Sequence, residues 1–348
     1  MNWAVSTHSK EDIDAAGRIL ISKRSSDDEK GQAISIINNW RAAHAFPLNT
    51  LQMRLRTIAG DTDRKSLVSQ RIKRLSAIES KLRRLRNVTL STMQDIGGCR
   101  AVVDSADLVY KLEKKYKSGR ARHDLDKEND YIHQPTNDGY RSIHLIYKYV
   151  SDGSVQYNGQ RIEVQLRSRL QHAWATAVEI VDIFANQLLK VNQGDEVWER
   201  FFALMSSYIA FQEKTPIIPS TPDNKNELVK ELCDKARVLH VKDRLLAIKT
   251  IRTSKVLRKG SGYYYYLLDL DMEKRKLSIT PYKRSQAQEA STKTAELELA
   301  YRSKSHPNKD VLLVHVPSFN ELKRAYPNYF ADTDVFLDEL DRAFSESC

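Results

Sequence analysis

Apolar side chains recur along the first half of the chain at the spacing of helices. Between residues 27 and 60 they fall three and four positions apart, in a stripe made of Ala33, Ile34, Ile36, Ile37 and Trp40. Pro47 interrupts this pattern before a second helical stretch, Leu51 to Ile58. The same periodicity predicts helices at 170–189, 196–211 and 227–249, with a proline-containing break at 215–226.

Strand-like patterns occupy the middle of the chain and return near its end. Residues 99–103 and 142–149 are rich in β-branched, aromatic and small side chains, as strands are. From residue 161, apolar Ile162, Val164 and Leu166 alternate with polar residues, so two faces of a strand differ. Past about residue 250, strands are predicted at 263–271, 276–282 and 311–316, around a helix at 287–301. These elements predict an α+β protein with a large domain, 1–250, and a separate small α+β module, 251–348.

Length and charge narrow the class of protein. The 348 residues suffice for two domains with cores of their own. A net charge of +11 favours polyanionic partners such as RNA, and a second basic cluster at 111–122 adds to it. A solubilising surface explains the same charge equally well.

The number and spacing of the cysteines, together with the hydropathy of the chain, predict the cellular compartment of the protein. Cys99, Cys233 and Cys348 are too few and too scattered for a zinc site or a disulfide framework, which indicates a reducing compartment. The sequence has no run of about eighteen apolar residues, and its start lacks the apolar core of a signal peptide. We therefore expect a cytoplasmic protein without a membrane partner.

Two acidic positions are the first candidates for chemistry. Asp95 precedes the strand at 99–103, and a carboxylate at the mouth of a strand suits Mg²⁺. Glu163 shares the polar face of its strand with Gln165 and Arg167, and we expect this face to point into a site. An amphipathic surface strand would show the same alternation. Between the acids, a loop with Pro135 and Gly139 presents a tyrosine that can stack a base or fill the core.

Four ordered motifs carry a resemblance to a known family. They are Arg71-x-Lys73 with Ile78 and Lys81, Asp95-Ile-x-Gly98-x-Arg100, Asp130-Tyr-Ile-x-x-Pro135 with Gly139-Tyr140-x-Ser142-x-His144, and Glu163-x-Gln165-x-Arg167. In order and spacing they resemble the RelA/SpoT synthetases. The resemblance implies a mixed β-sheet core flanked by helices, nucleotidyltransferase-like, that transfers pyrophosphate from ATP to a ribose 3′-hydroxyl with Mg²⁺.

The resemblance also implies a role for each matching residue. Asp95 would coordinate Mg²⁺, and Glu163 would bind metal or take the hydroxyl proton. Tyr140 would stack the acceptor base, and Arg71 could stack on adenine. The remaining substrate-binding candidates are Lys73, Lys81, Arg100, Ser142, His144, Gln165 and Arg167. The alternative for the basic stretch 71–86, which holds seven Lys or Arg and one acid, is a solvated helix face.

The end of the chain resembles the inhibitory module of CapRel-type fused toxin–antitoxins, whose Tyr-x-x-Tyr motif is matched by Tyr326 and Tyr329. In that family the tyrosines obstruct ATP binding until a phage protein, such as a capsid subunit, releases them. Such toxins modify the 3′-CCA end of tRNA. Thr136 stands where alarmone synthetases typically carry a lysine. A tyrosine pair packed in its own core is the alternative interpretation of the motif.

We therefore expect a self-inhibited toxin of anti-phage defence with tRNA as substrate and a phage protein as activator. Two alternatives stay open. One is a (p)ppGpp or (p)ppApp synthetase, which an acceptor assay separates from the toxin. The other is an idle RNA-binding or phage-sensing protein, although such a protein has no need of both Asp95 and Glu163.

Overall fold

The computed structural model describes residues 3–118, 123–184, 195–249, 252–254, 262–303 and 308–346. Its helices are α1 (Lys10–Ile21), α2 (Asp27–Ala43), α3 (Ala45–Thr62), α4 (Leu75–Arg84), α5 (Ala106–Ser118), α6 (Arg169–Ile183), α8 (Asp195–Glu213), α9 (Lys225–Val238), α10 (Val241–Ile248), α11 (Ala287–Ser303), α12 (Phe319–Ala325) and α13 (Asp334–Glu346). Its strands are β1 (Leu67–Ile72), β2 (Gly97–Val103), β3 (Asp124–Asp130), β4 (Ile143–Lys148), β5 (Arg161–Ser168), β6 (Arg252–Ser254), β7 (Tyr263–Asp271), β8 (Lys276–Lys283) and β9 (Lys309–His315). Short 3-10 turns are η1 (Val155–Tyr157), η2 (Arg284–Gln286) and η3 (Pro327–Phe330).

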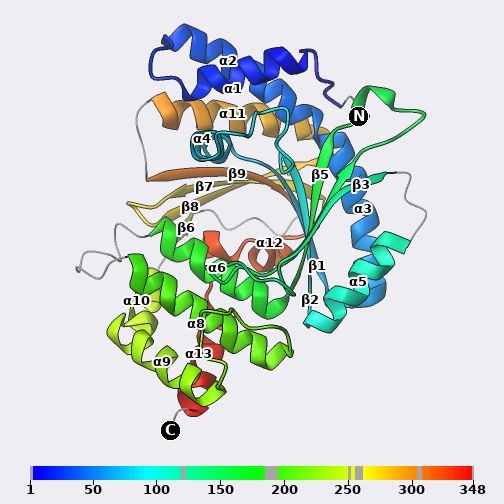
Figure 1. Cartoon of the computed structure of the whole chain (residues 1–348). Helices are drawn as coiled ribbons and strands as arrows, with labels where there is room; N and C mark the ends of the chain where they lie inside the picture. The colour runs from blue at the N-terminus through cyan, green and yellow to red at the C-terminus, as the bar shows by residue number, and fades with distance from the viewer. Residues whose placement is uncertain are drawn as a thin grey trace.

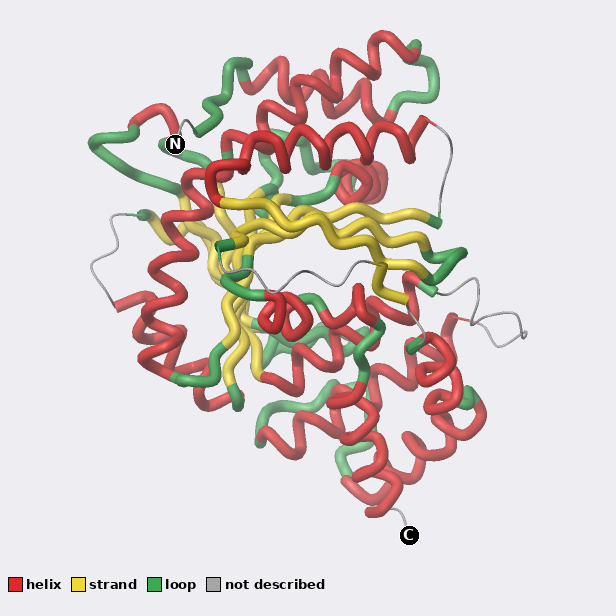
Figure 2. Tube along the Cα trace, turned by 180° about the vertical axis from the view of Figure 1, so that it is seen from behind, coloured by secondary structure: helices red, strands yellow, loops and turns green. Residues whose placement is uncertain are grey.

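The described strands form one mixed sheet of nine strands in the order β3-β4-β5-β2-β1-β9-β7-β8-β6. β2 and β5 run parallel, as do β6 and β8, and the other neighbours are antiparallel. Seen from behind, the strands make a continuous layer with helices on both sides (Figure 2). The predicted α+β fold with a mixed sheet flanked by helices is therefore confirmed.

The two halves of the sequence meet inside this sheet. β1 pairs with β9 in antiparallel register, Gln70 opposite His315 and Arg71 opposite Val314. The strands after residue 250 thus continue the sheet of the larger domain. The prediction of a separate module had implied that they would form a sheet of their own. The physical reason is that β1, with one side paired to β2, offers a second row of backbone groups that β9 satisfies.

Helices cover the two faces of the sheet in different ways (Figure 1). On one face α3 and α5 pack on the β1–β5 half, and α11 packs on β7 and β9. On the other face lie α6, which contacts β2 and β5, and α12, which contacts β1. The helices α8, α9 and α13 pack together beyond α6. The face under α6 and α12 is the one that carries the candidate site.

The basic stretch at 71–86, for which a solvated helix face was the alternative interpretation, is divided between a strand and a helix. Arg71 lies on β1, the helix α4 begins only at Leu75, and residues 85–96 form a connection in which Asp95 stands. The polar side chains of β1 had hidden the strand from a hydrophobic pattern, because Ser69 and Arg71 face a polar cavity and not the core.

Other helices differ from the predictions mainly at their ends. Pro47 lies in the first turn of α3, where a proline is tolerated, and the break between α2 and α3 falls at His44. The predicted helix 227–249 is divided into α9 and α10 by His240, whose φ of 49° is left-handed. Part of the predicted helix 170–189 lies outside the described residues. In the described part of the chain no helix is long and apolar enough to cross a bilayer.

Candidate active site

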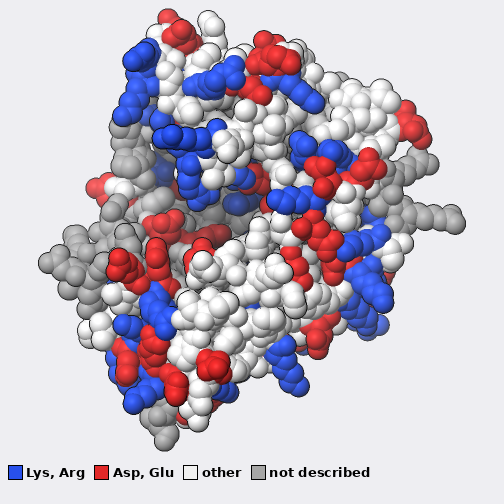
Figure 3. Space-filling model, in the orientation of Figure 1, with Lys and Arg blue, Asp and Glu red and all other residues white. Residues whose placement is uncertain are grey.

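A cavity of about 580 Å³ opens on the face of the sheet covered by α6 and α12. Its floor consists of polar side chains from β1, β2, β4 and β5, and its walls come from α4, α6 and the turn η3. In the space-filling view the centre of this face is hollowed, with Lys and Arg gathered along the upper rim (Figure 3). The cavity therefore joins segments from the beginning, middle and end of the sequence.

Asp95 stands between two lysines at one end of the cavity. Its carboxylate oxygens accept bonds from Lys73 Nζ at 2.7 Å and from Lys81 Nζ at 2.9 Å. Burial opposes the ionised form, but the two ammonium groups hold the pKa of Asp95 below its usual value. This end of the cavity thus has an ionised carboxylate paired with two ammonium groups, and such cations can also bind phosphate oxygens.

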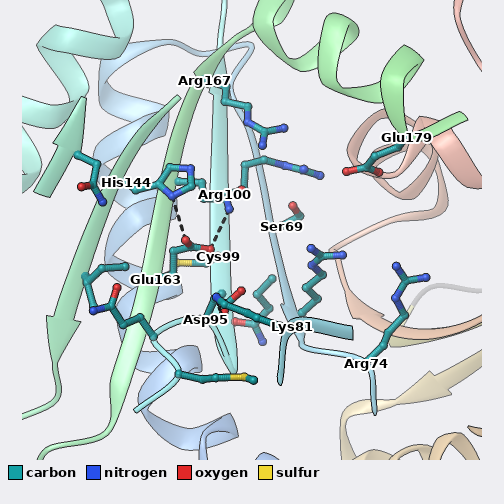
Figure 4. A pocket seen from close by; sticks show the side chains of 18 of the residues that line it. Ser69, Arg74, Lys81, Asp95, Cys99, Arg100, His144, Glu163, Arg167 and Glu179 are labelled. Carbon is teal, nitrogen blue, oxygen red and sulfur yellow. Dashed lines mark hydrogen bonds and ion pairs between the residues drawn. The ribbon is translucent and has the colours of Figure 1, made fainter. Parts of the chain in front are cut away.

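Glu163 begins a chain of contacts on the neighbouring strands. Its Oε1 lies 3.0 Å from His144 Nδ1, and Gln165 Nε2 donates to its Oε2 at 2.8 Å. The other ring nitrogen of His144 bonds to the Tyr140 hydroxyl at 2.7 Å, and Arg167 donates to that hydroxyl at 2.6 Å. Each member holds the next, so the carboxylate of Glu163 has a fixed orientation toward the cavity (Figure 4).

The charges in this chain reinforce one another. Burial disfavours the imidazolium, but the hydrogen bond and charge of Glu163, with Tyr140, raise the pKa of His144 to about 9. Burial also opposes the ionised carboxylate, yet His144 holds the pKa of Glu163 below its usual value. At neutral pH the pair is therefore a carboxylate and an imidazolium.

Two arginines line the cavity, Arg100 partly buried and Arg167 buried. Burial and the nearby charge of Arg167 lower the pKa of Arg100 to about 10, which leaves it charged at neutral pH. Among the described residues, Nε of Arg100 and both Nε and Nη1 of Arg167 have no hydrogen-bond partner. Two charged guanidinium groups that line one cavity are suited to an anionic ligand.

The segment with the two tyrosines closes this side of the cavity. Arg100 donates to the Ala325 carbonyl at 2.6 Å, and its guanidinium carbon lies 5.8 Å from the centre of the Tyr326 ring. The Tyr326 hydroxyl donates to the Gln70 carbonyl at 3.0 Å. Tyr326 is 4% exposed. Its side chain therefore occupies space beside Arg100 at this end of the cavity, where the ring of a planar ligand could otherwise lie.

Tyr329 is held by a second set of contacts. Its hydroxyl donates to Asp310 of β9 and accepts a bond from Arg74, and Arg74 forms an ion pair with Asp310. Burial and the nearby carboxylate of Asp310 raise the pKa of Tyr329, although Arg74 opposes this. Both tyrosines thus line the cavity while packing in a core with Leu268 and Val314.

Most of the predicted site residues meet in this one cavity. The lining includes Arg71, Lys81, Asp95, Arg100, His144, Glu163, Gln165, Arg167, Tyr326 and Tyr329. The predicted alternation on β5 is confirmed, because Ile162, Val164 and Leu166 lie in the core on the opposite face. Lys73 stands behind Asp95 as its ion-pair partner.

Two predicted residues hold positions of a different kind. Ser142 is fully buried and donates to the Leu166 carbonyl at 3.1 Å, so it joins two strands and does not line the cavity. Tyr140 lies behind His144, and the Arg167 guanidinium carbon is 4.9 Å from its ring centre. Tyr131, to which the family resemblance gave no role, is the aromatic side chain that lines the cavity there.

Sequence reasoning missed several lining residues. Arg74 was counted only within a basic stretch, and the alternation of Ser69 and Arg71 on β1 was the signal that could have placed the strand. Glu179 of α6 would be assigned to the surface from its sequence context alone. It is exposed, but it stands on the cavity wall across from His144 (Figure 4).

The acids fit a magnesium ion that is shared with a substrate. Among the described residues there is no cluster of three or more His, Cys, Asp or Glu side chains that could hold a metal by themselves. Mg²⁺ at phosphate sites usually takes one or two carboxylates and completes its shell with water and substrate oxygens. Asp95 and Glu163 supply two carboxylates to one cavity, which matches that donor set.

The fold and the cavity define an α+β protein whose sheet carries a polar cavity with two carboxylates among lysines and arginines. The profile of the region found in RelA / SpoT proteins matches residues 70–181. Over 112 residues the chain is 30% identical to GTP pyrophosphokinase YjbM of Bacillus subtilis (strain 168), covering 31% of this chain and 52% of that protein. The chain therefore spans about half the length of this curated relative. The matched residues 70–181 contain both acids.

Solved structures show the same kind of similarity. Small alarmone synthetase 1 from Bacillus subtilis bound to its product pppGpp is 21% identical, with a TM-score of 0.41, over 51% of this chain and 94% of that one. Small alarmone synthetase 2 from Bacillus subtilis is 20% identical, with a TM-score of 0.42, over 51% of this chain and 93% of that one.

Proposed function

We propose that this protein is an ATP-dependent pyrophosphotransferase that acts on a ribose 3′-hydroxyl. The observation that carries the proposal is the placement of Asp95 and Glu163 in one cavity among lysines and arginines. Transfer of a phosphate group depends mainly on positioning and on neutralising charge, and this cavity offers both. The RelA/SpoT-type region covers the same residues.

Each end of the cavity has a part in the proposed reaction. Asp95 would hold Mg²⁺, which would neutralise the donor phosphates. Lys81, which lines the cavity, would turn from the carboxylate to the phosphates, while Lys73 stays paired with Asp95. Glu163, oriented by His144, would accept the proton of the attacking hydroxyl. Arg100 and Arg167, which line the cavity, would bind the remaining negative charge.

For the acceptor we propose the 3′-CCA end of tRNA. Arg83, Arg84 and Arg86 are exposed beside Leu85 and Val88, which line the cavity, so its rim is basic. Thr136 stands in the loop where alarmone synthetases typically have a lysine. The second basic cluster contributes less, because α5 packs on the opposite face of the sheet and Lys117 is paired with Glu113 and Glu128. Arg120 and Arg122 of that cluster lie outside the described residues.

We also propose that the protein inhibits itself and belongs to anti-phage defence. Tyr326 shares the cavity with the arginines that would bind ATP, and a tethered segment competes at a high effective concentration. A phage protein that binds the released segment better than the closed one would activate the enzyme. Incubating the wild-type protein with purified capsid subunits, and measuring transfer, tests this part separately.

The main experiment compares full-length proteins with ATP labelled at the β or γ phosphorus. The wild type, Tyr326→Ala/Tyr329→Ala, and the same double variant with Glu163→Gln are each given bulk tRNA, GDP plus GTP, or adenine nucleotides. We expect both labels to move to tRNA with the double variant, little with the wild type and none with Glu163→Gln. Movement of the γ label alone would mean phosphate transfer and would refute the proposal.

An alarmone synthetase is the second candidate, and the curated relative named a GTP pyrophosphokinase favours it. Labelling of guanine or adenine nucleotides with tRNA unlabelled would establish that alternative. If a folded double variant labels no acceptor, the chain is a binding protein and not an enzyme.

A further inference from the structure

The helix α4, which carries Lys81, begins without a cap of its own. Its N-cap residue is Arg74, whose side chain makes no capping hydrogen bond. The first N–H groups of a helix lack partners within the helix, and Ser, Thr, Asp or Asn usually supply an acceptor there. Arginine has only donors, so α4 needs an acceptor from elsewhere in the protein.

That acceptor comes from the C-terminal part of the chain. Glu298 on α11 accepts a hydrogen bond from the backbone N–H of Leu75, the first residue of α4, at 3.0 Å. Arg41 of α2 donates to both oxygens of Glu298, at 2.7 and 3.0 Å, and its Nε donates to the Lys73 carbonyl at 2.9 Å. A carboxylate at this end of a helix also interacts favourably with the helix dipole.

The contact is buried and is repeated one turn later. The side chains of Arg41 and Glu298 are each 9% exposed. Four residues further along α11, Arg302 forms an ion pair with Glu79, which lies four residues after Leu75. Arg302 also donates to the Leu20 carbonyl at 3.1 Å. Two successive turns of α11 therefore hold two successive turns of α4.

The segment held in this way supplies the cations of the ATP end of the cavity. Lys73 and Lys81 flank Asp95, and Arg74 lines the cavity between them and Tyr329. α11 packs on one face of the sheet, whereas α12 and η3 with the tyrosines lie on the other. The C-terminal part thus reaches the site from both faces, with a blocking segment on one and a supporting helix on the other.

We propose that Glu298 is a positioning residue of the pyrophosphotransferase site, so that the C-terminal part both blocks and completes it. This role of Glu298 rests on the proposed function. It requires that release moves α12 and η3 out of the cavity while α11 stays on α4. A partner that pulled the entire C-terminal part away would also remove the cap from the helix that grips the donor.

The test uses the full-length Tyr326→Ala/Tyr329→Ala protein as parent. Adding Glu298→Ala should raise KM for ATP about tenfold, because one charged hydrogen bond and the cap are lost, and leave KM for the acceptor unchanged. Glu298→Gln, which keeps an acceptor for Leu75 but not the charge for Arg41, should fall between. Glu296→Gln is the matched control, because Glu296 is on the same helix, exposed, and paired only with Lys293 in the described part of the chain.

A second readout is independent of turnover. Hydrogen exchange at Leu75 and the next amides of α4 should accelerate in Glu298→Ala and not in the control, and binding of ATP measured by equilibrium dialysis should weaken in parallel. If both quantities match the Glu296→Gln control, Glu298 has no positioning role. If Glu298→Ala does not fold, Glu298→Gln decides by the same readouts. Absence of transfer in the parent would reject the proposed function and leave these two measurements valid.

Discussion

At the scale of single residues, the pair His144–Glu163 determines the charge at its end of the cavity. His144 is held between Glu163 at 3.0 Å and the Tyr140 hydroxyl at 2.7 Å, with the Tyr131 ring edge-on at 5.2 Å. Two further charges act on the partners of His144. Arg167 donates to the Tyr140 hydroxyl, and the charge of Asp95 acts on Glu163. The result is an imidazolium that stays protonated well above the pH where a free histidine loses its charge.

The pair makes stability depend on pH in a defined direction. The pKa of His144 is raised from 6.5 to about 9, so its stabilising contribution is complete below about pH 6.5 and is lost as pH rises to about 9. Thermal unfolding of the wild type should therefore lose stability across this window relative to His144→Gln, which cannot titrate. Equal pH profiles of the two proteins would contradict the assignment.

At the scale of elements, the turn before β4 packs directly on two helices. Gly139 has a φ of 98°, and a Cβ there would lie 2.9 Å from both Ser206 Cβ of α8 and Trp174 Cζ2 of α6. Ser206 also donates to the Gly139 carbonyl at 2.7 Å, and Arg141 donates to Ser206. The turn that leads to Tyr140 and His144 is thus positioned by the helical layer.

Substituting this glycine should cost both strain and packing. We expect Gly139→Ala to lower the free energy of unfolding by about 2–4 kcal/mol, because left-handed strain and overpacking add. Gly159→Ala separates the two effects, since Gly159 has a φ of 83° but a Cβ added there would meet no atom within 4 Å among the described residues. It should cost about 1 kcal/mol. Urea unfolding of both variants measures this, and equal losses would show that the close approach is harmless.

At the scale of the whole molecule, the seam between β1 and β9 makes the two parts of the chain one structure. Leu67 and Val102 pack in the same core as Leu268 and Val314, across that seam. Removing everything after residue 250 would leave β1 as an open edge strand and would also remove Glu298. The C-terminal part is therefore both a regulator, in the proposed function, and a structural neighbour of the site.

A shortened chain ending at residue 250 should accordingly be a poorer enzyme than the full-length double tyrosine variant. We expect at least about tenfold lower transfer, because the cap on α4 is gone. Self-association is also expected, because edge strands pair with other chains. Size-exclusion chromatography and the transfer assay measure the two effects. A monomeric shortened chain with higher activity than the double variant would overturn this view.

Local patterns in the sequence predicted much of the fold and the site. The strand 263–271 has the predicted bounds, and the alternation on β5 correctly placed Glu163, Gln165 and Arg167 on one face. Period-two and helical patterns survive in the sequence because each residue's neighbours along the chain decide which face it takes. On β1 the alternation is broken, because Gln70 is polar at the position between Ser69 and Arg71 where the pattern would have an apolar side chain.

The features that the sequence alone determined lie close together along the chain, whereas those that the tertiary structure decided join distant segments. The two acids and their motifs are local spacings, and the sequence contained them in full. Three other contacts join segments more than two hundred residues apart. They are the pairing of β1 with β9, the contact of Tyr326 with the cavity and the cap of α4 by Glu298. No local spacing encodes such contacts, because they arise only when the sheet closes and brings unsatisfied backbone and charged groups to the same place.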